Sequence, residues 1–67
     1  MNKYIIYTFL MDSKNEPLLV YLRESLNGFY WNVDVDNATR FDSFLDAVDQ
    51  IKHFRLQFTN KCKIKMI

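Results

Sequence analysis

The sequence WNVDVDNATRFDSF, residues 31–44, places three aspartates, two asparagines and an arginine between apolar residues. A calcium loop of the EF-hand type needs oxygen ligands at alternating positions, a glycine at the sixth position and a glutamate at the twelfth. Counted from Asp34, the sixth position holds Thr39 and the twelfth holds Leu45. No metal site is therefore expected, and the segment is interpreted as the exit from a strand, a turn and a helix cap.

A helix is predicted directly after this segment. Asp42 or Ser43 is suited to cap it, because a short polar side chain can accept a hydrogen bond from a backbone N–H of the first turn. Asp46 follows three residues after Ser43 and favours the positive end of the helix dipole. Apolar residues then recur at spacings of three and four, which indicates one buried stripe that ends near Asn60. The stripe consists of Phe44, Ala47, Val48, Ile51, Phe54 and Phe58.

Three strands are predicted before the segment. Residues 3–11, 18–23 and 29–33 are rich in β-branched and aromatic side chains. The first two strands are separated by the turn-forming residues 12–17, and the last two by Asn27-Gly28, where both residues tolerate positive φ. These strands are expected to form an antiparallel meander.

The C-terminal sequence KCKIKMI, residues 61–67, alternates lysines with apolar residues and predicts a strand with one buried face. Its lysines suit an edge strand, where charge discourages pairing with other chains. The predicted fold class is α+β in the order β-β-β-α-β, a single small domain over residues 1–67. It comprises a three-stranded antiparallel meander, one helix packed on one face and a C-terminal fourth strand. A right-handed crossover is expected to place this strand beside the first and parallel to the third.

The composition limits the classes of function. The chain has 67 residues, and a domain of this size buries only about 60% of its unfolded surface, so it is marginally stable alone. Cys62 and His53 are the only cysteine and histidine, which excludes an internal disulfide, makes structural zinc improbable and leaves no cofactor expected. Self-association is the remaining means of stabilisation, so a homodimer is expected. The apolar run near the N-terminus is too short to span a bilayer, and one unpaired cysteine fits a reducing compartment, so a cytoplasmic protein is expected.

Two surfaces are candidates for binding a partner protein. One helix covers only one face of a sheet, so the opposite face is expected to expose an aromatic patch, a feature that often marks interfaces. This patch consists of Leu19, Tyr21, Tyr30 and either Tyr4 or Tyr7. The second candidate is the acidic helix face of Asp42, Asp46 and Asp49. Whether the aromatic face serves dimerisation or target capture stays open at this point.

Catalysis is not expected. Cys62 lies on the apolar face of its predicted strand, where a small inert core residue is the usual case. His53 lies off the apolar stripe of the helix, where a solvated histidine is the usual case. No glycine-rich phosphate loop can form, since Gly28 is the only glycine.

Nucleic-acid binding is the alternative function. Sheets that bind single strands stack bases on aromatic residues beside basic side chains. The candidate basic residues are Lys61, Lys63 and Lys65 of the C-terminal strand. A net charge of +1 argues against this alternative.

The segment GFYWNVDVDNATRFDSFLDAVDQI, residues 28–51, resembles a pattern found in small uncharacterised proteins of Gram-positive bacteriophages and prophages. In that pattern a short aromatic strand leads through an acidic turn to an Ala-Thr-Arg-Phe segment, a capped helix and a Lys-rich strand. The matching residues are Tyr30, Trp31, Ala38, Thr39, Arg40, Phe41, Ala47 and Ile51. The resemblance implies a phage or mobile-element origin and a protein that binds and inhibits a host protein complex, including in counter-defence. It implies no catalytic residues.

Three residues of this pattern receive structural hypotheses. Phe41 is expected to pack back onto the first turns of the helix as a hydrophobic staple, and Ala38 to let the chain pass close to the sheet. Arg40 is expected to pair with a neighbouring aspartate and hold the turn. The alternative for Arg40 is a contact at the centre of an interface, where arginine is enriched.

Overall fold

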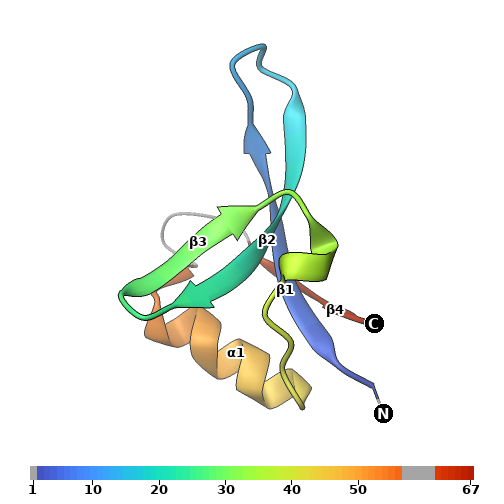
Figure 1. The fold of residues 1–67 in the computed structure, drawn as a ribbon, viewed down its shortest axis with the longest axis vertical. Helices are drawn as coiled ribbons and strands as arrows, with labels where there is room; N and C mark the ends of the chain where they lie inside the picture. The colour runs from blue at the N-terminus through green and yellow to red at the C-terminus, as the bar shows by residue number, and fades with distance from the viewer. Residues whose placement is uncertain (1, 57–61) are drawn as a thin grey trace.

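The computed structural model describes residues 2–56 and 62–67, and it confirms an α+β fold in the order β-β-β-α-β. Within this part of the chain, four strands form one sheet and one helix packs on it, with a short 3-10 turn between the third strand and the helix (Figure 1). The elements are β1 (Tyr4–Met11), β2 (Pro17–Ser25), β3 (Gly28–Asn32), η1 (Val35–Asn37), α1 (Phe44–His53) and β4 (Lys63–Met66).

The strand order in the sheet is β3-β2-β1-β4, and each neighbouring pair is antiparallel. β4 lies at the edge beside β1, as predicted, but its predicted parallel orientation to β3 is wrong, since the two strands run in opposite directions. The helix begins near the start of β1, where the rings of Phe44 and Tyr4 meet edge to face. Because α1 carries the chain away from this end of the sheet, β4 returns towards it and brings Met66 opposite Tyr4.

The strand register assigns the side chains to two faces of the sheet. Residues directly opposite one another in antiparallel strands share a face, so Leu22 and Trp31 lie together. They belong to the inner face, which meets α1; Tyr7 and Tyr21, paired across β1 and β2, point to the outer face. The buried residues of the core cluster under the helix are Ile6, Leu22, Phe41, Ala47 and Leu56.

The segment between η1 and α1 fills a gap between β1 and β2. The direct pairing of these two strands ends at the row that contains Tyr7. Beyond this row, the N–H of Thr39 donates to the carbonyl of Leu22 at 2.9 Å. Phe41 exchanges two backbone hydrogen bonds with Tyr4, at 2.8 and 2.9 Å. The segment therefore satisfies backbone groups that the separating strands would otherwise leave unpaired.

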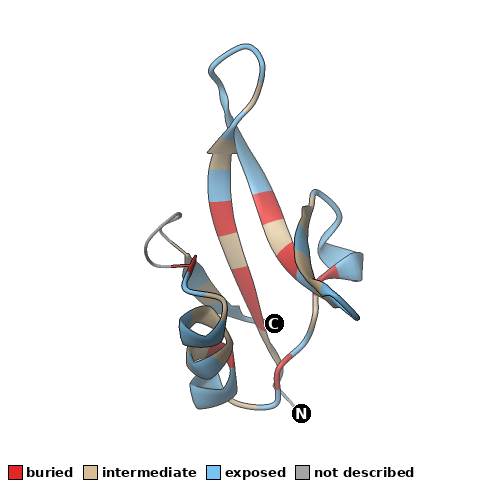
Figure 2. Cartoon of the chain, turned by 90° about the vertical axis from the view of Figure 1, so that its left-hand side faces the viewer, coloured by how far each residue is buried: buried red, intermediate tan, exposed pale blue. Residues whose placement is uncertain are grey.

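The outer face is partly covered, which corrects the expectation that only one face of the sheet has a cover. Ile5 and Ile6 are neighbours in β1 and point to opposite faces, yet both are 0% exposed. Figure 2 shows α1 and η1 on opposite sides of β1 and β2, and η1 contacts β2, so part of the outer face is covered. Ala38, directly after η1, is buried, in agreement with its expected close approach to the sheet.

The helix begins as predicted, with Ser43 rather than Asp42 as its cap. The side-chain oxygen of Ser43 accepts a hydrogen bond from the N–H of Asp46 at 3.1 Å. This bond satisfies one of the donors that the first turn of a helix leaves free. Phe41 is buried in the same core cluster as Ala47, as expected for a staple residue.

The helix is shorter than the apolar stripe suggests. It ends at His53, and Arg55 adopts a left-handed conformation with φ of 56°, which is typical of a helix stop. Leu56 then enters the core almost fully buried. Phe58 and Asn60, which were expected to continue and to end the helix, lie outside the described residues.

The turn between β2 and β3 is centred one residue earlier than predicted. Ser25 pairs with Gly28, so the two turn residues are Leu26 and Asn27. Gly28 has a positive φ of 138°, a conformation that side chains rarely adopt, whereas Asn27 does not share the positive φ that the sequence predicts.

The β1–β2 hairpin projects beyond the rest of the sheet (Figures 1 and 2). β3 pairs with β2 only from Tyr21 onward, and β4 pairs with β1 only as far as Tyr7, so the outer rows of the hairpin have two strands within the described chain. Asp12 holds the tip, because its Oδ1 accepts the N–H groups of Lys14 and Glu16 at 2.8 and 3.0 Å. We call this two-stranded segment, residues 8–20, the arm.

Candidate functional site

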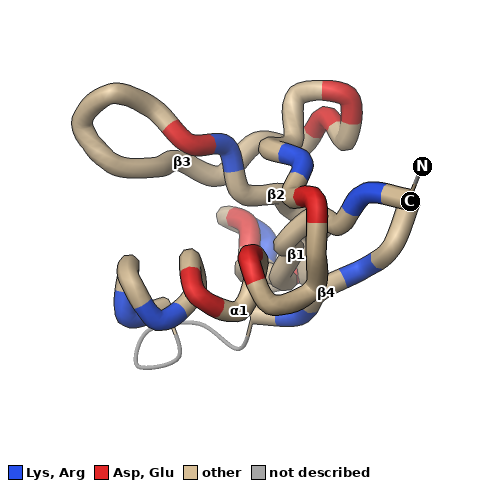
Figure 3. Tube along the Cα trace, turned by 90° about the horizontal axis from the view of Figure 1, so that it is seen from below, with Lys and Arg blue, Asp and Glu red and all other residues tan. Residues whose placement is uncertain are grey.

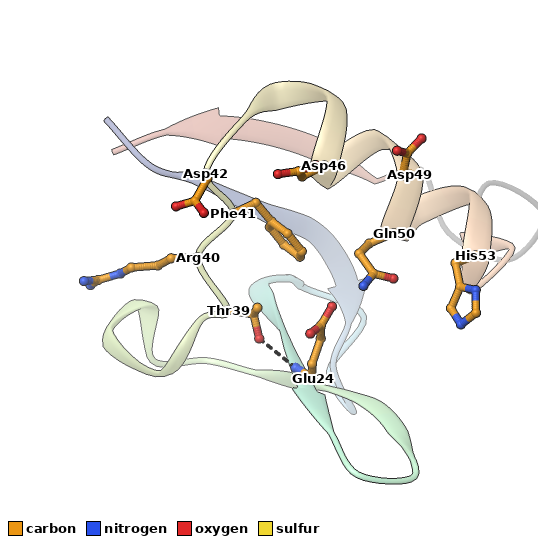
Figure 4. Close-up of a pocket in the computed structure, with 9 residues that line it drawn as sticks. All are labelled: Glu24, Thr39, Arg40, Phe41, Asp42, Asp46, Asp49, Gln50 and His53. Atoms are coloured by element: carbon orange, nitrogen blue, oxygen red, sulfur yellow. Dashed lines mark hydrogen bonds between the residues drawn. The ribbon is translucent and has the colours of Figure 1, made fainter. Parts of the chain in front are cut away.

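A groove of about 590 Å³ lies between β2, the segment after η1, and α1 (Figure 4). It combines the acidic helix face predicted from the sequence with residues of β2 and of the preceding segment. We call it the acidic groove. Its lining residues are Glu24, Thr39, Arg40, Phe41, Asp42, Asp46, Asp49, Gln50 and His53.

The helix places its polar residues along one wall of the acidic groove. The buried position of Ala47 turns the apolar stripe of α1 towards the sheet, so the polar residues between the stripe positions face the groove or solvent. The structure therefore brings together the three aspartates predicted from the sequence. These wall residues, spaced at four, three and four, are Asp42, Asp46, Asp49 and His53.

Glu24 supplies the opposite wall from β2, and the sequence analysis did not single it out. Its Oε1 atom is inaccessible to solvent and has no hydrogen-bond partner among the described residues. Its backbone N–H is satisfied, since it donates to Oγ1 of Thr39 at 2.7 Å. In Figure 4 the side chains of Glu24 and Gln50 extend towards each other across the groove. The buried oxygen is thus an acceptor in need of a donor.

A signal for Glu24 was present in the sequence. The inner-face positions of β2 alternate as Leu18, Val20, Leu22 and Glu24, so a carboxylate takes the place of the next apolar residue. A charged residue at an inward position near the core costs free energy unless it is paired. Such a break in the alternation indicates either the end of a strand or a functional residue. Because the turn begins at Leu26, two residues later, Glu24 could be interpreted as the end of the strand.

Among the aspartates of the groove, Asp42 has an ion-pair partner within the described residues. Nζ of Lys3 donates a hydrogen bond to its carboxylate and forms an ion pair with it. This hydrogen bond, together with the positive charge of Lys3, lowers the pKa of Asp42 from its ordinary value of 3.8. Asp46 and Asp49 are exposed and have no ion pair within the described residues. Their negative charge remains available to an approaching cation.

Arg40 does not have the expected structural role. Within the described residues the ion pair of Asp42 is with Lys3, and Arg40 pairs with none of the neighbouring aspartates. Figure 4 shows its side chain extending away from Glu24 and from the helix. The segment is instead held by the backbone of Thr39 and Phe41, through hydrogen bonds to β2 and β1. The interface alternative for Arg40 stays a prediction.

The predicted aromatic patch lies on the outer face. Tyr30 and Leu19 are 47% and 37% exposed, while Tyr21 is half-buried. Of the two alternatives, Tyr7 joins this face, because it pairs with Tyr21, whereas Tyr4 packs against the core.

The arm adds residues to the outer face that the sequence analysis did not name. Phe9 is 55% exposed and Met11 is 68% exposed, and the ring of Phe9 meets that of Tyr7 edge to face. The strand over residues 3–11 was predicted, but nothing in the local pattern indicated that its end extends beyond the neighbouring strands.

The lysines of β4 lie on the outer face as well. Lys63 is opposite Tyr7 and Lys65 is opposite Ile5, and both lysines are exposed. Lys61, the third lysine of the predicted set, lies outside the described residues. In Figure 3, acidic positions lie along the first turns of α1, and basic positions lie at its end and along β4.

Cys62 and His53 lie in different environments. Cys62 is half-buried beside the core, and burial raises the pKa of its thiol above 9.0. His53 is exposed and stacks edge to face on Phe54. Within residues 2–56 and 62–67, no three His, Cys, Asp or Glu side chains are grouped to hold a metal ion.

No helix in the described ranges is long and apolar enough to cross a membrane. No family model, curated protein or solved structure matches the chain.

Proposed function

We propose that this protein is a non-catalytic binding protein whose acidic groove receives a basic side chain of a partner protein. The observation that carries the proposal is the buried Oε1 of Glu24, which has no donor among the described residues. A buried acceptor without a donor costs about 1–3 kcal/mol. A partner that supplies the donor removes this cost on binding.

The groove has the charge and size for a lysine or arginine side chain. Asp46 and Asp49 are exposed without ion pairs in the described chain, and Glu24 lies across the groove from them. A guanidinium group carries five N–H donors in a planar fork, so it can supply the donor that the buried Oε1 of Glu24 lacks among the described residues. The volume of about 590 Å³ leaves room for such a side chain with part of its flanking backbone.

The partner in this proposal is a host protein complex, and binding inhibits it. The resemblance of residues 28–51 to small phage and prophage proteins supports this part of the proposal. The groove itself is built by that segment, since residues 39–42 and the start of α1 form much of its lining. A small domain that holds a basic residue of its target blocks that residue from its normal contact. Counter-defence is one process in which such inhibition acts.

A short peptide titration tests the groove directly. The probes are two blocked pentapeptides, Gly-Gly-Arg-Gly-Gly and the same peptide with citrulline, which keeps the shape of arginine but lacks its charge. The arginine peptide is expected to shift the amide NMR signals of Glu24, Thr39 and Gln50. The variant Glu24→Gln is expected to bind this peptide about tenfold more weakly, because hydrogen bonds to charged groups contribute about 1.5–3 kcal/mol. Equal shifts with the citrulline peptide, or shifts away from the groove, would contradict the proposal.

Nucleic-acid binding is the second candidate function. The observation that favours it is the row in which Lys63 of β4, Tyr7 of β1 and Tyr21 of β2 lie side by side on the outer face. Basic side chains beside aromatic rings suit single strands. Fluorescence anisotropy with a labelled dT12 oligonucleotide at 20 and 200 mM salt tests it, because phosphate contacts weaken steeply with salt. Absence of binding at the lower salt concentration removes this candidate.

A further inference from the structure

In a single copy of the chain, the arm lacks the third strand or packed outer face that usually stabilises a two-stranded hairpin. It consists of two strands beyond the rows where β3 and β4 pair in the described residues. An isolated two-stranded hairpin is marginally stable in water, and a third strand or a packed face is needed to hold it. The outer side of the arm has no cover from α1, which packs on the other side of the sheet, or from η1, which contacts β2 nearer the body.

The exposed side chains of the arm are apolar on the outer face. Phe9 lies opposite Leu19, and Met11 lies opposite Pro17, so the four residues form two adjacent rows. The next row towards the body contains Tyr7 and Tyr21. The result is a continuous apolar strip of three rows that runs along the arm, with its most exposed residues near the tip.

The chain exposes more surface than a compact monomer of its mass. The chain has an accessible surface of 5072 Å², whereas a compact monomer of 8.1 kDa has about 4,500 Å² by the usual scaling with mass. The excess is roughly 570 Å², and a standard interface buries about 800 Å² on each partner. The elongated shape, with extents of 37 × 23 × 21 Å, agrees with a projecting element.

The charges on this side of the molecule are arranged for a second copy of the chain. The tip of the arm carries Asp12 and Glu16, both acidic, with Lys14 between them. The base of the arm carries Lys63 beside Tyr7, and Lys65 one row further along β4. If two arms lie antiparallel about a two-fold axis near Phe9, the acidic tip of each copy meets the basic base of the other.

The acidic groove cannot serve the same purpose. A two-fold interface brings the same surface patch of both copies together, and this would place Glu24, Asp46 and Asp49 against their own equivalents. Like charges directly opposed across an interface are unfavourable. The outer strip with its acidic tip and basic base is self-complementary, while the groove is complementary to a different, basic partner.

We propose that two copies of this chain pair through the outer faces of their arms, antiparallel about a two-fold axis near Phe9. Phe9 and Leu19 of each copy meet at the axis. Met11 of one copy packs on Tyr7 of the other, and Glu16 at each tip lies near Lys65 at the partner's base. This pairing assigns the aromatic outer face to dimerisation and leaves the acidic groove of each copy free. The pairing does not depend on what the groove binds.

Multi-angle light scattering at about 50 μM, combined with circular dichroism to confirm folding, tests the pairing. The wild-type chain is expected at twice 8.1 kDa, and Phe9→Lys at the mass of one chain with an unchanged dichroism spectrum. The matched control is Leu26→Lys, because Leu26 is fully exposed at the opposite end of β2 and its replacement leaves the arm intact. This control is expected to stay dimeric.

A charge exchange tests the antiparallel arrangement. Glu16→Lys is expected to weaken dimerisation about tenfold, and the added change Lys65→Glu in the same chain to restore it, since the exchange recreates the tip-to-base pair with reversed signs. A wild-type mass of one chain overturns the proposal, as does a Phe9→Lys variant that stays dimeric. A mass larger than two chains, or no rescue in the double variant, overturns the closed antiparallel arrangement.

Discussion

Replacing Glu24 by methionine removes the buried acceptor that distinguishes the acidic groove. Methionine keeps the length of the side chain and is compatible with the apolar inner face, where Glu24 is paired with Phe29 across β2 and β3. An unsatisfied buried acceptor costs about 1–3 kcal/mol, and the low end applies because the residue as a whole is partly exposed. We therefore expect the free energy of unfolding to rise by about 1 kcal/mol, which corresponds to an increase in Tm of about 4–8 °C for a domain of this size.

Urea unfolding followed by the fluorescence of Trp31, which packs against the core, measures the change. The comparison is made at one protein concentration, because dimerisation couples to apparent stability. Asp36→Met is the control, because it removes a carboxylate at an exposed position outside both the groove and the arm, where an effect within about 0.5 kcal/mol is usual for a surface substitution. A loss of 1 kcal/mol or more in Glu24→Met would refute the reasoning, since it would show that the carboxylate stabilises the free protein.

Four further outcomes are expected. Ile5→Ala lowers the free energy of unfolding by about 2–5 kcal/mol in a thermal melt, because Ile5 is fully buried under the outer-face cover; a change below about 1 kcal/mol would show that this face is open. Lys3→Met raises the pKa of Asp42 towards 3.8, as measured by NMR titration of its carboxyl carbon, because the hydrogen bond and charge of Lys3 lower it. The lowered pKa contributes stability that is present above the unfolded pKa of Asp42 and lost as the pH falls through its lower folded pKa. The variant therefore loses less stability than the wild type over that acidic range, and equal losses would contradict the pairing. Cys62 reacts more slowly with iodoacetamide at pH 8 in the folded chain than in urea, because burial raises the pKa of its thiol; equal rates would contradict this. Arg40→Ala leaves the free energy of unfolding unchanged within about 0.5 kcal/mol, since Arg40 has no ion pair in the described chain, and a clear loss in a urea titration would restore its structural role.

The order of the elements followed from local patterns in the sequence. Period-two alternation, the capping position at Ser43 and the apolar spacing of α1 each depend on neighbouring residues alone, so they could be interpreted without knowledge of the fold. The acidic helix face was predicted for the same reason, because helical spacing places Asp46 and Asp49 on one side of α1.

The features that escaped prediction depend on contacts between distant residues. The orientation of β4 follows from the place where α1 begins, and this is set by the bonds of Phe41 to Tyr4 across the sheet. The partial cover of the outer face depends on η1, which lies on the side of β2 away from α1. The groove likewise needs Glu24 of β2 to meet Gln50 of α1, residues that no local pattern relates. Periodicity indicates which side of an element is apolar but not which segment will cover it.

Affinity capture from a bacterial host lysate tests the acidic groove as the partner-binding site most directly. Tagged wild-type chain, Glu24→Gln and the control Asp36→Asn, at an exposed position outside the groove and the arm, are compared at equal loading after nuclease treatment, and the bound proteins are quantified by mass spectrometry. We expect the wild type and the control to retain at least one host protein complex that Glu24→Gln does not retain. The arginine pentapeptide is expected to displace this complex from the wild type, whereas its citrulline counterpart is not. Equal capture by all three chains, or no displacement by the arginine peptide, would contradict a groove that receives a basic side chain.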